Sequence, residues 1–138
     1  FNAVGPRGAQ ALTALRGSAR LRILSLSLEA NGIGDAGAES LAILRDAPAL
    51  CCLSLNLASN QLLMSGAPLL TALFASASLQ TLSLNLSCNN IRPADMQALC
   101  AMQNEAPIRA LNLQLYDHLH YGGGLELREV LRALRGKT

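Results

Sequence analysis

Two histidines near the end of the chain are the residues best suited to bind a metal ion. They stand in the segment D-H-L-H, in which His118 and His120 follow Asp117. In an extended segment alternate residues lie on one face, so both imidazoles could reach one ion. Because no third strong ligand follows at helical or strand spacing, we interpret the pair as residues of a terminal capping coil and predict no metal site.

Two glycine-containing segments could in principle bind an anion. Y-G-G-G at 121–124 precedes an expected helix and could expose backbone N–H groups, and G-K-T stands at 136–138. A phosphate-binding P-loop would need glycine at position 131, where this chain has leucine. We therefore interpret these glycines as turn residues and predict that the chain binds no cofactor.

The cysteines could supply a nucleophile, and they are Cys51, Cys52, Cys88 and Cys100. No pair has the C-x-x-C spacing of a zinc or redox site. A nucleophilic cysteine also needs a histidine base, and both histidines lie at the far end of the chain. We predict that the chain is not an enzyme. We also expect reduced thiols in an intracellular compartment, cytoplasmic or organellar, in a protein that is not secreted.

The elements that position these residues repeat with a period of 29 residues. Within each repeat leucines alternate with polar residues, which predicts a strand with one buried face. The second half of each repeat has apolar residues at helical spacing, such as Leu70 and Leu73. The aligned leucines of the first half are Leu24, Leu53, Leu82 and Leu111; Leu26, Leu55, Leu84 and Leu113; and Leu28, Leu57, Leu86 and Leu115.

Each repeat is therefore predicted to be a strand, a turn and a helix, and strands joined through helices must be parallel. We expect one domain, 1–138, whose first helix lacks a strand of its own, so that upstream residues or a partner should cover that end. The predicted strands are 23–28, 52–57, 81–86 and 110–115. The predicted repeats are a partial repeat at 1–20, full repeats at 21–49, 50–78 and 79–107, and a capping repeat at 108–138.

The pattern L-x-x-L-x-L-x-L-x-x-N-x-I resembles the leucine-rich repeat family, in particular its ribonuclease-inhibitor-like class, over essentially the whole chain. The resemblance implies an α/β fold: a right-handed solenoid with a parallel sheet of about four strands on the concave side and about five helices on the convex side. It also implies that Asn31, Asn60 and Asn89 form a structural ladder, bonding backbone groups at the bend rather than a ligand. An extra L-x pair precedes each of these asparagines, so we expect strands about two residues longer, or a bulge.

Two surfaces remain for a partner. On the concave face the side chains between the buried leucines are short and uncharged, and only Tyr116 is of a type that favours binding hot spots. The absence of charge from Ala47 to Ile91 suggests a second surface on the convex side, the alternative being a wider core. The candidate partner residues are Ser54, Asn56, Ser83, Asn85, Asn112, Gln114 and Tyr116 on the sheet, and Leu63, Met64, Leu69 and Phe74 on the convex side.

Composition narrows the kind of partner. A net charge of +2 is too small for a nucleic-acid footprint. Segment 61–82 is uncharged and long enough to cross a membrane, but glycine and proline interrupt it, so any membrane contact should be indirect, through a membrane-associated assembly.

We therefore predict a protein–protein interaction or scaffold module, an accessory subunit of a larger intracellular or organellar assembly. The alternative is the C-terminal repeat region of a larger regulatory or adaptor protein, such as a ligase adaptor, an innate sensor or a GTPase regulator. A third hypothesis, an enzyme or metal protein, rests only on His118 and His120.

Overall fold

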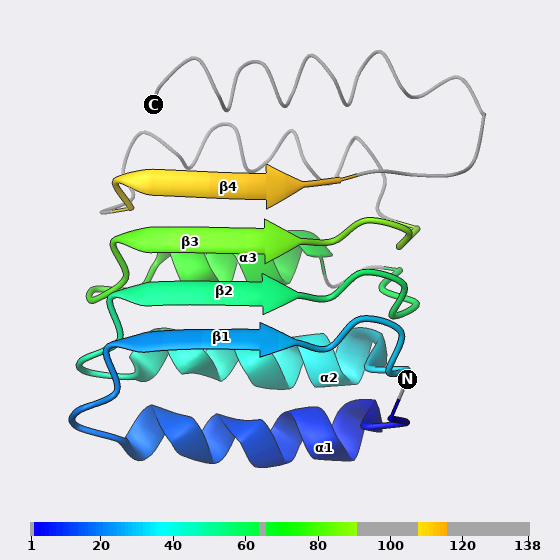
Figure 1. Cartoon of the computed structure of the whole chain (residues 1–138), viewed down its shortest axis with the longest axis horizontal. Coiled ribbons are helices and arrows are strands. Elements are labelled where there is room, and N and C mark those ends of the chain that lie inside the picture. Colours follow the sequence, from blue (N-terminus) through cyan, green and yellow to red (C-terminus); the bar gives the residue numbers. More distant parts are fainter. Residues whose placement is uncertain (1, 64–65, 91–107, 116–138) are drawn as a thin grey trace.

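Four parallel strands form one sheet in the computed structural model, which describes residues 2–63, 66–90 and 108–115 (Figure 1). The strands lie side by side in chain order, and each pairs with the next at a shift of one repeat, so that Leu26 lies beside Leu55 and Leu55 beside Leu84. Each strand begins at its predicted residue and ends one residue before the predicted end. The strands are β1 (Ile23–Ser27), β2 (Cys52–Asn56), β3 (Thr81–Asn85) and β4 (Ala110–Gln114).

Three α-helices of the described residues pack behind one face of this sheet, and no described helix covers its other, open face (Figure 1). The first two helices each continue into a 3-10 helix, and Pro6 stands in the first turn of the first helix, where it interrupts no hydrogen bond. The two further helices of the five predicted fall in 91–107 and 116–138, outside the described residues. The helices are α1 (Gly5–Leu12), η1 (Thr13–Gly17), α2 (Gly34–Leu41), η2 (Ala42–Asp46) and α3 (Gly66–Phe74).

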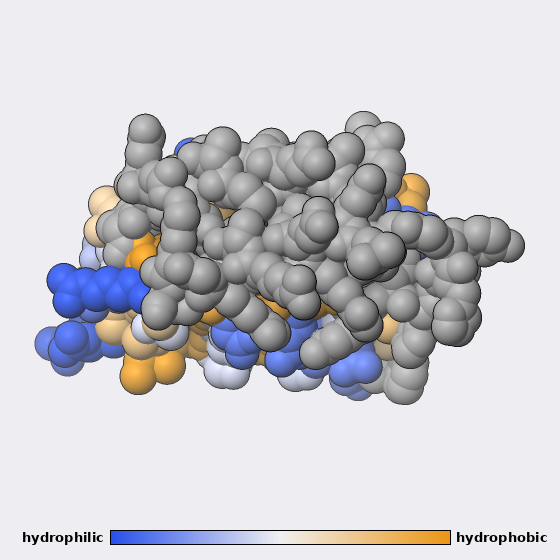
Figure 2. Space-filling model, turned by 90° about the horizontal axis from the view of Figure 1, so that it is seen from above, coloured by the Kyte–Doolittle hydropathy of each residue, from blue (hydrophilic) through white to orange (hydrophobic). Residues whose placement is uncertain are grey.

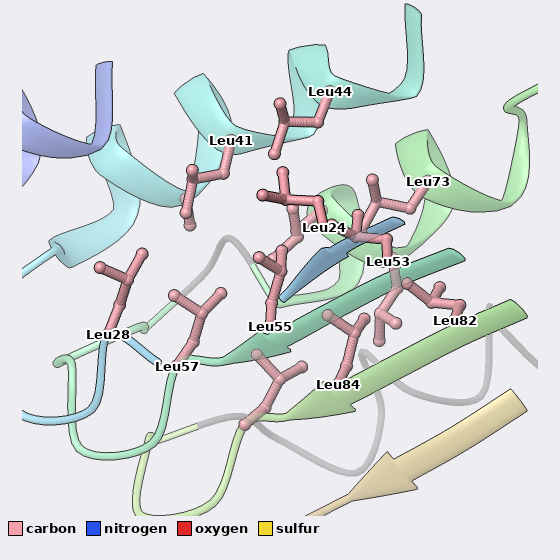
Figure 3. Packing of buried hydrophobic residues seen from close by; sticks show 14 of the residues in the cluster. Leu24, Leu28, Leu41, Leu44, Leu53, Leu55, Leu57, Leu73, Leu82 and Leu84 are labelled. Carbon is pink, nitrogen blue, oxygen red and sulfur yellow. The ribbon is translucent and has the colours of Figure 1, made fainter. Parts of the chain in front are cut away.

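The core consists of leucines that fill the space between the sheet and the helices (Figure 3). Leu55 and Leu84 point from the strands toward the helices, where Leu41, Leu44 and Leu73 point back toward them. All five are at most 1% exposed. Burial of each such side chain contributes roughly 1.5–3 kcal/mol, so the repeated leucines are the main source of stability.

The outermost coil is less well buried than the coils inside the stack. Leu26 of β1 is only partly buried, whereas its counterparts Leu55 on β2 and Leu84 on β3 are each 1% exposed. The cause is position, because within the described residues β1 has a paired strand on one side only. Coils that have neighbours on both sides lose solvent contact from both directions.

The extra L-x pair does not lengthen the strands, so the first of the two expected alternatives, a strand about two residues longer, was wrong. The pairing between coils instead continues past the strand ends. The N–H of Leu28 donates to the carbonyl of Asn56 at 2.8 Å, and the N–H of Ala30 donates to the carbonyl of Ala58 at 3.0 Å. Ala30 then takes a positive φ of 52°, as do its counterparts Ser59 (55°) and Cys88 (56°). The extra residues are thus accommodated in a left-handed turn that recurs in each described coil.

Leu69 and Phe74 belong to the core, which corrects the prediction that they lie on an exposed convex surface. Leu69 is 1% exposed and Phe74 4% exposed. The prediction assumed one helical geometry in every repeat, but the coil of α2 changes to the 3-10 helix η2 after Leu41, whereas α3 stays α-helical through Phe74. Four residues of α-helix return a side chain to within about 40° of its starting direction. Four residues of 3-10 helix rotate it by about 120°.

The equivalent position in η2 is therefore turned to solvent, where Arg45 is exposed. In α3 the same column places Phe74 almost beneath Leu70, which is fully buried. Leu69 likewise lies one α-helical turn before the buried Leu73. The apolar stripe of α3 is thus wider than that of α2, and this wider core accounts for part of the uncharged segment.

Candidate binding surface on the open face of the sheet

The open face of the sheet carries the side chains that alternate with the buried leucines. Because successive strand residues point to opposite faces, every second side chain of β1 to β4 points away from the helices. The parallel register aligns these side chains into three rows, in which neighbours lie about 4.8 Å apart. The rows are Ile23, Cys52, Thr81 and Ala110; Ser25, Ser54, Ser83 and Asn112; and Ser27, Asn56, Asn85 and Gln114.

Exposure within the rows follows the position of the strand. On the outer strands Ser25 and Asn112 are exposed, whereas Ser54 and Ser83 on the two inner strands are half-buried. The side-chain hydroxyls of Ser54 and Ser83 make no hydrogen bond within the described part of the chain. Ile23 is the most exposed large apolar side chain described, at 69%. Its alternation with the buried leucines marks Ile23 as outward-facing, although it was not among the residues predicted to contact a partner.

Two of the candidate amides also shape the turn that follows their strands. Asn56 accepts a hydrogen bond from the N–H of Ala58 at 3.2 Å and donates from Nδ2 to Glu29 Oε2 at 3.0 Å. Asn85 accepts in the same way from the N–H of Ser87 at 3.1 Å. These contacts hold the amide row in a defined orientation at the edge of the open face.

The rows carry no charge. The ion pair among the described residues, Arg45–Asp46, lies in η2 on the helix side, with the two charged groups 3.4 Å apart. Both side chains are exposed, so the pair contributes little to stability. In Figure 2 the lower edge of the view is the open face seen side on, and along its described part hydrophobic (orange) atoms lie toward the left, followed by weakly polar (white) and hydrophilic (blue) atoms. Such a surface offers hydrogen bonds and small apolar contacts rather than an electrostatic field.

The asparagines that follow the strands are engaged inside the protein. Asn60 is fully buried, and its Oδ1 accepts from the N–H groups of Asn31 (3.0 Å) and Ile33 (3.1 Å) in the preceding coil. Its Nδ2 donates to the carbonyls of Leu28 (2.8 Å) and Ala58 (3.1 Å). One amide therefore satisfies four backbone groups from two coils, which a bend away from water would otherwise leave unpaired.

Asn89 and Asn31 make the same kind of bonds one coil later and one coil earlier. Asn89 Oδ1 accepts from the N–H groups of Asn60 (2.9 Å) and Leu62 (3.0 Å). Asn31 Oδ1 accepts from those of Asn2 (2.9 Å) and Val4 (3.4 Å). The three asparagines thus link consecutive coils.

The candidates expected on the helix side separate into different environments. Leu63 is 51% exposed at the start of the third coil, and its N–H donates to Asp35 Oδ1 at 3.0 Å. Leu69 and Phe74 are buried in the core, as described above. Met64, Tyr116 and both histidines lie outside the described residues. The described candidates that remain accessible are therefore Leu63 and the residues of the open face.

The described part of the chain contains no group of three or more His, Cys, Asp or Glu side chains arranged to hold a metal ion. None of its helices combines the length and apolar character that a membrane span requires.

Two segments of the chain, 22–42 and 78–100, match the family model described as Leucine Rich repeat. These two segments are leucine-rich repeats. The first contains β1 and α2, and the second contains β3. The intervening coil places Leu53, Leu55 and Asn60 in register with the leucine-rich repeats on either side. A comparison with curated proteins found no match. Leucine-rich repeats are in general protein-interaction modules, so proteins are the kind of partner that they suggest.

Proposed function

We propose that this chain is a non-enzymatic protein-interaction or scaffold module, and an accessory subunit of a larger intracellular or organellar assembly. One observation carries the proposal: three aligned rows of uncharged side chains lie on a sheet face that no described helix covers. A rigid sheet holds these groups at fixed spacing, which reduces the entropy lost when a partner binds.

The same proposal includes the finer architecture. The coils continue as a right-handed solenoid of the ribonuclease-inhibitor-like class, with the sheet on its concave side and five helices on its convex side. The repeat period supports this, because the 29-residue spacing that joins Asn31 to Asn60 and Asn60 to Asn89 is the same throughout the described coils. A constant shift per coil produces a regular stack.

The chemistry of the open face favours binding over catalysis. Serine hydroxyls and carboxamides at neutral pH are weak acids and bases, so general acid–base work would need an imidazole or a carboxyl group beside them. The three rows contain neither, and the carboxylate that lies beside them, that of Glu29, is engaged by the Asn56 amide at 3.0 Å. The rows also lack the clustered Lys and Arg that would bind a phosphate backbone, so a protein surface is the better match than a nucleic acid.

A neutral surface of this kind should recognise its partner by hydrogen bonds and shape. Ser54 and Ser83 lie in the centre of the face, where a partner would exclude water, and Ile23 at its border offers an apolar contact. Central, desolvated contacts contribute most to binding, and the surrounding contacts mainly keep water out. We expect the partner to present backbone or uncharged polar groups to the Ser54–Ser83 row.

The outer side of the first coil favours a second candidate function. Leu12, Leu21 and Leu26 are only partly buried there, although their counterparts in the next coil, which are Leu41, Leu50 and Leu55, are at most 1% exposed. Another folded unit packed on this side would bury them. This observation is in accord with the chain being the repeat region of a larger regulatory or adaptor protein, such as a ligase adaptor, an innate sensor or a GTPase regulator.

Site-directed photo-cross-linking in the native source tests the first proposal. A photoreactive residue at Thr81, which is exposed on the open face, is compared with one at Glu39, which is exposed on α2. We expect a discrete partner protein to be linked from Thr81 and not from Glu39. Equal cross-linking from both positions, or a free monomer without any cross-link, would overturn the proposal.

A matched pair of charge variants strengthens the test. Ser83→Arg places one positive charge in the centre of the open face, and Gln10→Arg places the same charge on the exposed side of α1. We expect Ser83→Arg to abolish the cross-link from Thr81 and Gln10→Arg to leave it intact. Far-UV circular dichroism of both variants checks that the fold is retained.

A further inference from the structure

Two adjacent thiols lie together at the start of β2. The Sγ atoms of Cys51 and Cys52 are 3.8 Å apart, and both side chains are half-buried. This proximity is unusual, because successive residues of a regular strand point to opposite faces of the sheet. Adjacent cysteines in a regular strand would therefore hold their thiols apart.

The cause is a local break in the strand pattern. The N–H groups of Cys51 and Cys52 both donate to the carbonyl of Arg22, at 2.9 and 3.0 Å. Two successive N–H groups on one carbonyl are typical of a β-bulge, in which the strand bends and re-aims a side chain. The same doubled contact recurs one coil later, where Gln80 and Thr81 both donate to the carbonyl of Cys51. The bend is thus a property of the repeat. Among the described residues, the bend before β2 is the one at which two cysteines stand.

The spacing of the two sulfur atoms matches one edge of a metal coordination tetrahedron. Two thiolates bound tetrahedrally at about 2.3 Å from a zinc ion are separated by about 3.8 Å. A disulfide fits much less well, because adjacent Cα atoms are about 3.8 Å apart across a trans peptide, whereas disulfides usually need about 4.4–6.8 Å. The geometry therefore favours binding of an ion over oxidation of the pair.

We propose that Cys51 and Cys52 form a two-thiolate site for a thiophilic divalent cation of the zinc type. Binding converts both thiols into thiolates: two S–H bonds break, two metal–sulfur bonds form and two protons pass to solvent. The hydrogen bond from Cys51 Sγ to the carbonyl of Arg22, 3.3 Å long, is exchanged for a metal–sulfur bond. The described chain supplies two ligands, so the other coordination positions take water or a partner's side chains.

Neither thiol is fully buried, so an ion can reach the site without unfolding of the coil. The proposal does not depend on the protein-binding function of the open face, because metal binding is measured on the isolated chain.

Titration of the reduced chain with Cd²⁺, which has strong thiolate charge-transfer absorbance, tests the site. A Cys88→Ser/Cys100→Ser variant retains Cys51 and Cys52 as its two thiols. We expect this variant to bind one ion per chain, to release two protons per ion and to lose the ultraviolet band when excess Zn²⁺ is added. Adding Cys51→Ser or Cys52→Ser to that variant should abolish the band.

Protection from alkylation supplies a second measurement on the unmodified chain. Zn²⁺ should slow the reaction of iodoacetamide with Cys51 and Cys52 and leave the rate at Cys88 unchanged, as read by peptide mass spectrometry. A Cd²⁺ band that survives Cys51→Ser would overturn the proposal. Equal protection of Cys88, or an ion shared between two chains, would do the same.

Discussion

Replacement of Asn60 by alanine should be among the most destabilising single changes in the described coils. Its amide joins two coils, and the side chain is 0% exposed, so water cannot easily take its place. The variant leaves the N–H groups of Asn31 and Ile33 without the acceptor that now lies 3.0 and 3.1 Å away. It also removes the hydrogen bond that Asn60 donates to the carbonyl of Leu28. The carbonyl of Ala58 loses its bond from Asn60 as well, but it still accepts a hydrogen bond from the N–H of Ala30.

The magnitude follows from these orphaned groups. A buried donor left without an acceptor costs about 1–3 kcal/mol, so two such N–H groups and one carbonyl together should lower the free energy of unfolding by about 4 kcal/mol. Asn31→Ala is the matched control. Its Oδ1 accepts from Asn2 and Val4 at the rim of the first coil, where Asn2 is exposed and water can replace the amide. We expect that variant to lose only about 1 kcal/mol.

Urea denaturation followed by far-UV circular dichroism measures both changes, since the chain has no tryptophan to report by fluorescence. A lower midpoint with an unchanged m-value would show a loss of stability rather than of compactness. Asn60→Asp refines the test, because it keeps the acceptors and loses the donors. Equal losses for Asn60→Ala and Asn31→Ala, or a loss below about 0.5 kcal/mol for Asn60→Ala, would refute the account of the ladder.

Three further outcomes are expected. Phe74→Ala should lower the free energy of unfolding by about 3–5 kcal/mol, whereas Leu63→Ser should change it by less than about 0.5 kcal/mol; urea midpoints that fall equally would contradict the burial assigned to each. Gly37→Ala should cost about 1–3 kcal/mol, because the added Cβ would lie 2.6 Å from Ile33 and crowd α1 against α2, whereas Gly17→Ala, with open space around it, should be tolerated in thermal unfolding. Partner binding at the neutral open face should change less than about twofold between low and high salt in a titration, and a steep salt dependence would point to a charged surface instead.

The strands, their order and their register follow from the repeat pattern of the amino-acid sequence. Alternating leucines predict a strand with one buried face, and a constant period forces Leu26, Leu55, Leu84 and Leu113 to lie side by side. The reason is physical: a parallel sheet built from identical coils has one register that buries every leucine, and a slip by one residue would turn them all to solvent. The position of Asn60 at the bend follows from the same period, because a bend leaves backbone groups that an amide can pair.

The tertiary structure alone decided which apolar side chains of the helix layer are covered. If α3 is given the geometry of the preceding repeat, Leu69 and Phe74 are predicted to be exposed. Both are buried, because α3 stays α-helical where the earlier coil becomes a 3-10 helix. That difference is a small change of twist per residue, accumulated over one turn. Sequence spacing does not contain it.

The proximity of the Cys51 and Cys52 thiols also depends on the tertiary structure. Adjacent residues in a regular strand point apart, so the sequence suggests no site there. The shared bond of both N–H groups to the carbonyl of Arg22 comes from the coil before, and it bends the strand until the two sulfur atoms are 3.8 Å apart. Periodicity specifies what each repeat buries, but the hydrogen bonds between repeats set where individual side chains point.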